Sequence, residues 1–363
     1  MPKLTFHHIM FGCDPEFFFS KDGRVLGAEK VLPEDGLVYK KGDLLNSPKD
    51  GDYTSLSGVS KIIIDGVQAE LNPRANSCRA NLGNEIACCF RKLAQALKNR
   101  KDISIDFHQT IKLDKKDMSV LSDKSKKFGC MPSKNAHNGG KESRIGVDPA
   151  IYSYRSAGGH IHIGNSNDNK IIREVLLQPE RLVKIMDVIV GNTCVLIDRD
   201  TGNIERRKVY GRAGEFRTPP HGVEYRTLSN FWLRSYQLMS LVMYLSRLAV
   251  LVVANNRDEE LLKLVDMRDI TDAINKNDFK LALTNFKKIE KCLMEMIPSD
   301  TEHWDVNPDT IHLFRHFVKK GLDYWFKQPP LQHWIELPEG HYSGFGSFLL
   351  NKVADDLANK SKT

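Results

Sequence analysis

The amino-acid sequence predicts an α+β protein whose C-terminal part is helical. Over the first two-thirds of the chain, segments with the two-residue alternation of a strand are interleaved with segments in which apolar residues recur at the spacing of a helix face. From Asn230 onward the helical spacing alone remains. Strands interleaved with helices, followed by helices alone, are typical of an α+β domain with a helical C-terminal part.

Strands are predicted where apolar and polar residues alternate, or where a short apolar run lies between turn formers. Phe17-Phe18-Phe19 is the first such run, and Lys21-Asp22-Gly23-Arg24 after it has the composition of a hairpin turn. Asp65-Gly66 marks either a turn between two strands or a kink in one. In chain order, the predicted strands are residues 6–20, 25–28, 61–72, 103–113, 157–164, 214–218 and 223–228.

Helices are predicted where apolar residues recur every three or four positions. Ile86, Phe90, Leu93 and Leu97, for example, share one face of a helix. Pro179 suits the start of another helix, because its missing N–H is not needed in the first turn. In chain order, the predicted helices are residues 81–100, 179–196, 231–255, 278–296, 309–325 and 342–357.

Two long loops are expected, at residues 32–60 and 112–146. The first contains several glycines and two prolines, and the second is rich in lysine, glycine, serine and asparagine. Loops of that length in a compact domain are usually functional or disordered. For residues 112–146, a solvated surface loop and a cover over a substrate are both open.

The composition bounds the size and the partners of the protein. With 363 residues, the chain can bury a large core and form one large domain or two. Its 53 Lys and Arg residues against 46 Asp and Glu residues leave a net charge of +7. This bias permits an anionic partner such as a nucleotide, but it is far short of that of a dedicated nucleic-acid binder. We therefore expect no nucleic-acid partner.

Cysteines and apolar segments predict a cytoplasmic protein without a membrane partner. The seven cysteines are odd in number and contain no C-x-x-C pair, which is typical of reduced thiols. The first residues show no basic start followed by an apolar run, so no secretory signal is expected. The longest apolar segment, Leu238–Ala254, contains Ser240, Tyr244, Ser246 and Arg247, which fits a buried helix better than a membrane span.

Polar residues two positions apart recur on five of the predicted strands. Because side chains on a strand alternate between faces, each set lines one face while apolar residues line the other. The sets are Asp14 and Glu16; Gln68, Glu70 and Asn72; His160 and His162; Glu215 and Arg217; and Glu224 and Arg226.

A single set of this kind has an ordinary explanation. Glu215 with Arg217 fits a solvated sheet with cross-strand ion pairs, and His160 with His162 fits a buried, hydrogen-bonded pair. Five sets in one chain would be costly as buried charge unless something neutralises it. Metal ions and phosphates would do so.

The residue types indicate which ions these are. Carboxylates with one or two imidazoles, and no cysteine in any set, favour Mg²⁺ or Mn²⁺ over structural zinc. Arg207, Arg212, Arg217 and Arg226 add fork-shaped positive charge suited to phosphate oxygens. Together, carboxylates, divalent metal ions and arginines indicate phosphoryl transfer, a reaction in which catalysis depends mostly on positioning and electrostatic stabilisation. The sequence has no Walker-type or G-x-G-x-x-G loop, so metals and arginines on a sheet would have to hold the nucleotide.

Four motifs resemble a known family. GCDPEFFF, DGVQAELNPR, SAGGHIHIG and YGRAGEFRTPPHGVEYRTLSN, in that order, resemble the carboxylate–amine ligases of the glutamine synthetase and glutamate–cysteine ligase fold. The closest resemblance is to the phage-encoded COOH–NH2 ligase type 2 group of amidoligases, across residues 8–235. It implies a curved, mainly antiparallel sheet, a half-barrel with helices on its outer face. The concave face would hold two or more divalent cations between ATP and the substrate.

The resemblance also implies a role for each acidic strand residue. Asp14 and Glu16 would each ligate a different metal ion, and Glu70 would join Glu16. His160 and Glu224 would join Asp14 at the ion nearer the nucleotide phosphates. Many relatives have Glu where this chain has Asp14, and the second extra glutamate of glutamine synthetase has no evident counterpart.

The remaining site residues are implied to bind phosphate. His162 would contact a phosphate or the nucleotide, and Arg212 and Arg217 would bind the phosphates of ATP. Arg207 is expected to bind the nucleotide on the ground of its charge, without support from the resemblance. Arg226 would contact the transferred phosphoryl group or the substrate carboxylate, so that Arg212, Arg217 and Arg226 form the expected catalytic set. Glu215 gains no role from the resemblance and is expected to be a structural partner.

The implied activity is that of an ATP-dependent ligase. ATP would phosphorylate a carboxylate of an amino acid or peptide to an acyl phosphate, and an amine would then displace phosphate to give an amide or isopeptide bond. A loop, part of 112–146 or of 32–60, would keep water from the acyl phosphate. A catalytic domain at residues 1–256 with a helical extension at 257–363, or one continuous domain, is expected. A relative of phage enzymes would act in the host cytoplasm.

Other functions stay open from the residues alone. His-x-His on a strand also occurs in metal-dependent hydrolases, although that reading leaves the arginines unexplained. Guanidino kinases share the general fold, so a phosphotransferase is a related alternative. A non-enzymatic binding protein has only the mild basicity in its favour.

Overall fold

The computed structural model describes residues 4–40, 59–126, 133–143, 147–148, 151–297, 309–322 and 330–336. Within these ranges the strands form antiparallel sheets, and helices pack against them. The predicted helix at 342–357 lies outside the described residues, as does most of the predicted loop at 32–60. The mixture of antiparallel sheet and helix confirms the predicted α+β fold class.

In the described part of the chain, two six-stranded sheets and a two-stranded sheet make up the strand framework. In spatial order, the first sheet contains β1 (Ile9–Cys13), β12 (Ile161–Asn165), β14 (Gly222–Tyr225), β13 (Glu215–Arg217), β9 (Ser133–Asn135) and β10 (Lys141–Ser143). The second contains β3 (Arg24–Leu26), β2 (Glu16–Lys21), β6 (Gln68–Asn72), β5 (Val59–Asp65) and β4 (Leu37–Lys40), with β7 (Ile103–Asp106) also paired to β2. The small sheet pairs β8 (Thr110–Lys112) with β11 (Tyr154–Ser156).

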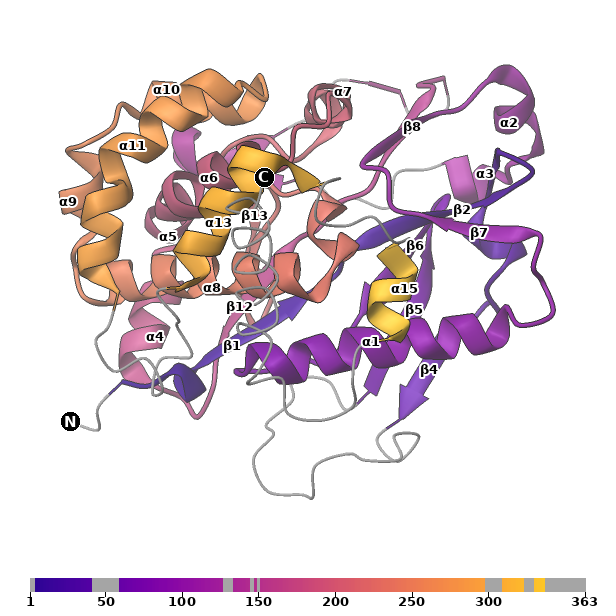
Figure 1. Ribbon diagram of the computed structural model, residues 1–363, viewed down its shortest axis with the longest axis horizontal. Helices are drawn as coiled ribbons and strands as arrows, with labels where there is room; N and C mark the ends of the chain where they lie inside the picture. Colours follow the sequence, from indigo (N-terminus) through magenta and orange to yellow (C-terminus); the bar gives the residue numbers. More distant parts are fainter. Residues whose placement is uncertain are drawn as a thin grey trace, which may run out of the picture.

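The two large sheets are joined through β1 and β2. Only Asp14 and Pro15 separate these strands, which run one after the other across the molecule (Figure 1). Proline has no N–H to donate to a ladder, so a break between two sheets is a suitable place for it. Asp14 therefore lies where one sheet ends, and Glu16 where the next begins.

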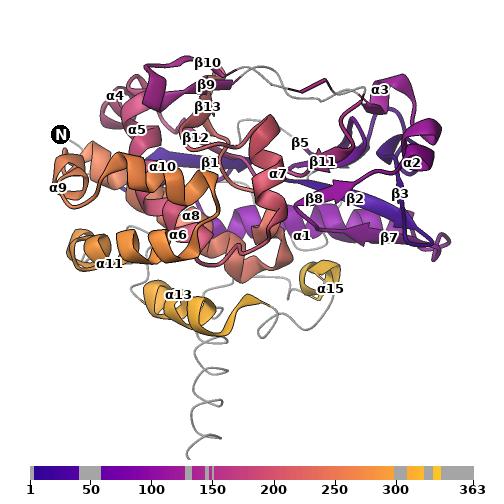
Figure 2. The ribbon, with the colours of Figure 1, turned by 90° about the horizontal axis from the view of Figure 1, so that it is seen from above.

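Several helices cover one side of this framework, while α3, α4 and α5 lie toward the other (Figure 2). Figure 2 shows α1, α11, α13 and α15 on the same side of β1 and β2, with β9 and β10 toward the opposite side. The longer helices are α1 (Arg79–Ala96), α5 (Pro179–Met186), α7 (Gly202–Val209), α8 (Tyr236–Ala254), α10 (Met267–Asn275), α11 (Phe279–Met296) and α13 (Asp309–Lys320). The shorter ones are α2 (Lys115–Val120), α3 (Asp123–Lys126), α4 (Lys170–Leu176), α6 (Asn192–Val195), α9 (Asp258–Leu262) and α15 (Pro330–Ile335).

One buried apolar cluster extends from the sheets into the C-terminal helices. It includes Phe17 of β2, Phe90 of α1, Leu248 of α8 and Ile289 of α11. The domain division at residue 256 stays a prediction. Among the described residues, α8 is the helix long and apolar enough to cross a membrane, but 83% of it is buried in the protein, as a core helix would be.

The structure corrects several predicted boundaries. The expected loop at 112–146 contains α2, α3, β9, β10 and the short 3-10 helix η3 (Ala136–Asn138), and β9 and β10 extend the first sheet. The strand predicted at 103–113 is two strands, because β7 pairs with β2 while β8 pairs with β11. The strand predicted at 157–164 begins only at Ile161, because Gly158 makes a single bridge to Ser229 instead.

Sequence periodicity also failed to predict some helices. The helices α4, α7, α9, α10 and α15 were not predicted. The helix predicted at 179–196 is interrupted by a π-helical turn, η4 (Asp187–Gly191). The predicted helix at 231–255 is divided, because a 3-10 helix, η5 (Asn230–Arg234), precedes α8.

Candidate metal centre

Two groups of side chains that could hold a metal ion lie at the junction of the large sheets. The histidine group contains Asp14, His160 and Glu224, and the carboxylate group contains Glu16, Asp65 and Glu70. Within each group, one ligand atom from each residue lies within 4.8 Å of the others. The structure thus brings together the five residues predicted to ligate metals, in the predicted partition, and adds Asp65.

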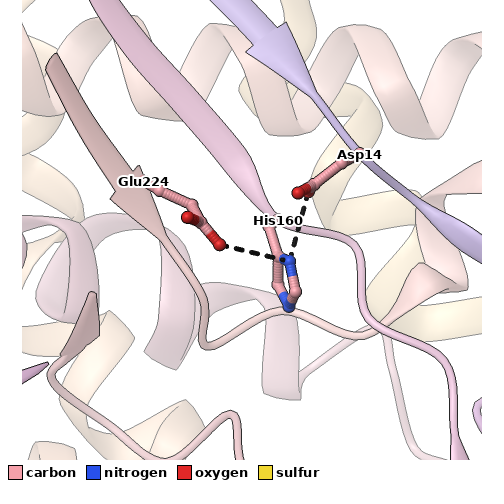
Figure 3. A group of neighbouring side chains, drawn as sticks. All are labelled: Asp14, His160 and Glu224. Carbon is pink, nitrogen blue, oxygen red and sulfur yellow. Dashed lines mark ion pairs between the residues drawn. The ribbon is translucent and has the colours of Figure 1, made fainter. Parts of the chain in front are cut away.

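Strand pairing assembles the histidine group. Asp14 follows β1, His160 precedes β12, and Glu224 lies on β14, the other neighbour of β12. His160 lies between the two carboxylates, with its Nδ1 3.2 Å from Asp14 Oδ1 and 3.5 Å from Glu224 Oε1 (Figure 3). Residues on or next to three strands that are distant in sequence therefore meet at one imidazole.

The carboxylate group is built by the β2–β6–β5 part of the second sheet. Glu16 and Glu70 are register partners on β2 and β6, and Asp65 ends β5 just before the turn to β6. Asn72 Nδ2 donates to Glu70 Oε1 at 2.7 Å. The predicted strand at 61–72 is therefore two strands with Asp65-Gly66 at the turn, and that turn adds a third carboxylate.

The carboxylate group carries more negative charge than its surroundings neutralise. Burial and the nearby Asp65 raise the pKa of Glu16 to about 8. Burial and the repulsion of Asp14 hold the pKa of Glu70 well above its usual value, and burial also raises the pKa of Asp65. A divalent cation bound to these oxygens would offset both the cost of burying the carboxylates and the repulsion between them, as expected of a metal site.

The charges and buried atoms of the histidine group also favour a bound cation. Burial alone would raise the pKa of Asp14, but His160 and His162 outweigh it and hold this pKa well below its usual value. Burial lowers the pKa of His160, which favours the neutral form that binds a metal ion. The Nε2 of His160 is buried without a hydrogen-bond partner among the described residues, while its Nδ1 faces the Asp14 and Glu224 oxygens. Buried polar atoms normally have partners, so a cation fits here.

Two of the predicted phosphate-binding arginines border the histidine group. Arg226 Nε lies 3.0 Å from Glu224 Oε1, and Arg217 Nη1 lies 3.6 Å from the same oxygen. Arg226 is buried and also donates from Nη1 to Ser133 Oγ on β9. Arg217 keeps 27% of its side chain exposed, so it can reach a ligand in solvent.

The other two arginines lie elsewhere in the described structure. Arg212 donates to the carbonyl oxygens of Arg207 and Lys208 at the end of α7, at 2.8 and 3.0 Å, and its Nη1 is 3.3 Å from Ser143 Oγ. Arg207 is buried with its Nη1 bonded to Asn277 Oδ1 at 3.2 Å, and burial lowers its pKa to about 10. These contacts hold both side chains to protein groups that belong to neither ligand group, although Arg212 keeps 34% of its side chain exposed.

His162 is oriented by protein groups on both sides of its ring. Its Nε2 lies 3.2 Å from Asp14 Oδ2, and its Nδ1 lies 2.8 Å from His221 Nε2. Burial opposes protonation of His162, but the Asp14 carboxylate outweighs this and raises its pKa. The structure thus places His162 beside a ligand of the histidine group, where its predicted contact with the nucleotide stays a prediction.

Glu215 has a structural place, as expected. Its buried carboxylate accepts from the backbone N–H of Gly211 at 2.7 Å and from Ser143 Oγ at 2.9 Å. It therefore ties the turn after α7 to β10.

Four residues of this region were not predicted from the sequence: Asp65, Ser133, Tyr210 and His221. Asp65 was interpreted only as a turn residue, although it precedes the Gln68–Asn72 set by three positions. Its position opposite Gln68 in the β5–β6 hairpin was the available signal. Ser133, Tyr210 and His221 reach the site by long-range packing, which no local pattern indicates.

The chain is similar in sequence to a class of enzymes, the carboxylate–amine ligases. The family model that matches is that of the phage phiEco32-like COOH.NH2 ligase-type 2, and it matches residues 144–322. This match confirms the resemblance predicted from the motifs, and its range includes SAGGHIHIG and the stretch from Tyr210 to Asn230.

Solved structures show distant similarity. A bifunctional glutathione synthetase from Pasteurella multocida is 9% identical, with a TM-score of 0.46 over 91% of this chain and 48% of that chain. The chain thus spans about half the length of that protein. A structure described as a novel glutamine synthase homolog is 9% identical, with a TM-score of 0.30 over 86% of this chain and 70% of that chain. No curated protein matches the sequence.

Proposed function

We propose that this protein is an ATP-dependent carboxylate–amine ligase that forms an amide or isopeptide bond on an amino acid or peptide. One observation carries the proposal: six metal-ligand residues divide into two groups at one sheet junction, and Arg217 and Arg226 both contact Glu224 of the histidine group. Two cation sites beside paired guanidinium groups suit the binding and transfer of a phosphoryl group. The family match supports ligation as the outcome.

Each ligand group would hold one Mg²⁺ or Mn²⁺ ion. Asp14, His160 and Glu224 supply two carboxylates and an imidazole for one ion, and the carboxylate group supplies oxygen ligands alone for the other. When bound, these ions neutralise the triphosphate and polarise the phosphoryl oxygens. The absence of cysteine from both groups is consistent with this choice of metal.

The arginines have separate tasks in the proposed reaction. Arg226 is held rigidly by Glu224 and Ser133, so its charge is pre-organised and costs no rearrangement during transfer. Arg217 is partly exposed and is suited to the nucleotide phosphates that arrive from solvent. Arg207 and Arg212, which the sequence placed with them, would need to leave their protein partners to do the same.

Two bond changes make up the reaction. A carboxylate oxygen of the acid substrate attacks the terminal phosphorus of ATP, and the bond from that phosphorus to the bridging oxygen breaks, which gives an acyl phosphate and ADP. The amine nitrogen then attacks the acyl carbon, and phosphate leaves with the electron pair of the C–O bond while the nitrogen loses a proton. Water must be kept away from the acyl phosphate between these steps.

A coupled assay tests the proposal against its alternatives. Protein, ATP and Mg²⁺ are incubated with pooled amino acids and peptides, and ADP and inorganic phosphate are measured. A ligase releases both only when a carboxylate and an amine are present, and hydroxylamine in place of the amine yields a hydroxamate. ADP with a stable phosphorylated product indicates a phosphotransferase, and hydrolysis that needs no ATP indicates a metal-dependent hydrolase.

Variants connect any turnover to the site. Glu70→Gln removes one charge from the carboxylate group and is expected to abolish ADP release. Glu259→Gln on α9, where the side chain is exposed, is the matched control and should keep wild-type activity. If no substrate pair gives turnover after broad screening and Glu70→Ala binds ATP as tightly as the wild type, the assignment is wrong.

A further inference from the structure

We propose that Tyr210 is a positioning residue of the metal centre, which orients Glu16 toward the carboxylate group through its hydroxyl and contacts the histidine group through its ring. This inference rests on the proposed function, because it concerns the same two cation sites. Neither the motifs nor the predicted ligand roles assign anything to Tyr210. It is the residue that caps the C-terminal end of α7, and it is 5% exposed.

The hydroxyl of Tyr210 determines which oxygen of Glu16 is available. It donates to Glu16 Oε2 at 2.9 Å, and the same oxygen accepts from the backbone N–H of Gly158 at 2.6 Å and from Gln68 Nε2 at 3.4 Å. Three donors thus converge on Oε2, which leaves Oε1 for a cation shared with Asp65 and Glu70. Hydrogen bonds to a ligating carboxylate orient it in this way in metal sites generally.

The ring of Tyr210 touches the other half of the centre. Its edge meets the ring of His160, with centroids 5.7 Å apart and planes at 70°. The guanidinium carbon of Arg226 lies 5.5 Å from the ring centroid. One side chain therefore contacts a member of each ligand group and also the arginine that borders Glu224.

Arg206 holds the ring in this place. Its guanidinium carbon lies 4.7 Å from the Tyr210 centroid, and its nitrogens donate to the carbonyl oxygens of residues 226, 227 and 228. Gly211 makes room for it: the backbone there has a φ of +80°, and a Cβ would lie 2.2 Å from Arg206 Nη1. The Tyr210 ring is thus fixed by a buried cation that is itself bonded to the backbone.

A purely structural role makes a different prediction. Tyr210 Oη is also 3.1 Å from the carbonyl oxygen of Ser156 on β11, so the hydroxyl could simply tie α7 to the small sheet. In that case its loss would lower stability and affect the two cation sites equally or leave them unchanged. In a positioning role, its loss weakens the site that contains Glu16 and spares the other.

The test is a titration of the protein with Mn²⁺. Binding is measured by isothermal titration calorimetry and by the electron paramagnetic resonance signal of free Mn²⁺. Tyr210→Phe removes the hydroxyl and keeps the ring contacts with His160 and Arg226. We expect one class of Mn²⁺ site to weaken about 10- to 100-fold, as is usual when an outer partner of a metal ligand is lost, while the other class is unchanged. Tyr152→Phe is the matched control, because its hydroxyl bonds a carboxylate, Glu205 Oε2, at 3.2 Å outside the centre.

Each outcome separates this inference from the proposed function. If the wild type binds two Mn²⁺ ions and Tyr210→Phe binds both with unchanged affinity, the positioning role is wrong and the proposed function stands. Equal weakening of both classes, with a lowered melting temperature, also overturns it in favour of the structural role. If the wild type binds no Mn²⁺, both proposals fail. Tyr210→Leu, which also loses the ring contacts, is expected to weaken both classes and provides a positive control.

Discussion

Glu16 and Glu70 are direct register partners on the antiparallel strands β2 and β6. Like charges at such positions destabilise a sheet, and Glu16 is also buried. The strands can pair in this register only if the charge is neutralised by protons or by a cation. The pKa values of both carboxyl groups are raised accordingly, so the metal-free and metal-bound proteins should respond differently to pH and to substitution.

We first predict that the stability of the metal-free protein falls as the pH rises from 6.5 to 8. The pKa of Glu16 is about 8 in the folded protein against 4.5 in the unfolded chain, so the folded state binds more protons in this window and the free energy of unfolding decreases with pH. The raised pKa values of Glu70 and His162 add to this decrease. Burial lowers the pKa values of His160 and His221, which opposes the decrease near pH 6.5, where these histidines begin to lose their protons in the unfolded chain.

Melting temperatures in EDTA and in Mn²⁺ measure this dependence. We expect Mn²⁺ to raise the melting temperature more at pH 8 than at pH 6.5, because a cation replaces the proton on Glu16. The slope in EDTA should become shallower in Glu16→Gln, which cannot ionise. A melting temperature that is independent of pH in EDTA, or an equal effect of Mn²⁺ at both pH values, would contradict the proposed cause.

A second prediction concerns Asp65, the carboxylate that the motifs did not indicate. Asp65→Asn keeps the Asp65-Gly66 turn but removes one charge from the carboxylate group, so we expect one class of Mn²⁺ site to weaken about 10-fold or more. Asp22→Asn is the matched control, since Asp22 precedes a glycine in the β2–β3 hairpin and is exposed. Equal Mn²⁺ affinity in the two variants would show that Asp65 is not a ligand.

A third prediction separates Arg226 from an ordinary ion-pair residue. Arg226→Lys cannot reproduce the fork that reaches both Glu224 and Ser133, so we expect kcat to fall about 10²- to 10³-fold while the KM for ATP changes little. Steady-state ADP release measures both constants. Arg257→Lys provides the comparison, because the two bonds of Arg257 to Glu260 lie at the surface. If the KM for ATP rises with kcat unchanged, Arg226 binds nucleotide without acting in transfer.

A fourth prediction concerns the attachment of β9 and β10 to the helices. Asp187 is fully buried in η4 and accepts from Tyr225 Oη at 2.7 Å, and His137 Nε2 lies 2.6 Å from its other oxygen. His137→Ala leaves a buried carboxylate oxygen without this partner, so we expect the free energy of unfolding to fall by about 1–3 kcal/mol. Urea denaturation measures this change.

Lys134→Ala on β9, the strand that leads into η3, is the control for the His137 variant. Lys134 is exposed and makes a 3.4 Å contact with Thr218 Oγ1, so its removal should change stability by less than about 0.5 kcal/mol. Comparable losses from the two substitutions would show that the His137–Asp187 contact adds no stability of its own.

Local sequence was a good guide to the strands that carry the ligands. The alternation around Glu16 and around Glu70 predicted strands that the structure contains, since one buried face imposes a two-residue period on any such strand. The single strand predicted at residues 6–20 is wrong, because β1 and β2 belong to different sheets and Asp14 lies in the break between them. The same reasoning failed for residues 112–146. Ser133 lies on a strand because β9 pairs with β13, and Lys141 lies on a strand because β10 pairs with β9. The sequence of the β9–β10 hairpin has no alternation that would predict these pairings.

The amino-acid sequence by itself determined the fold class and which residues offer carboxylate, imidazole and guanidinium groups to one face of each strand. These properties depend on neighbours along the chain, within the reach of a two- or four-residue period. Only the tertiary structure decided that Asp65 joins Glu16 and Glu70, that Arg207 and Arg212 are bonded to other protein groups, and that Tyr210 contacts both ligand groups. Those relations join residues up to 194 positions apart in the chain, so packing of the folded sheets, and no local pattern, establishes them.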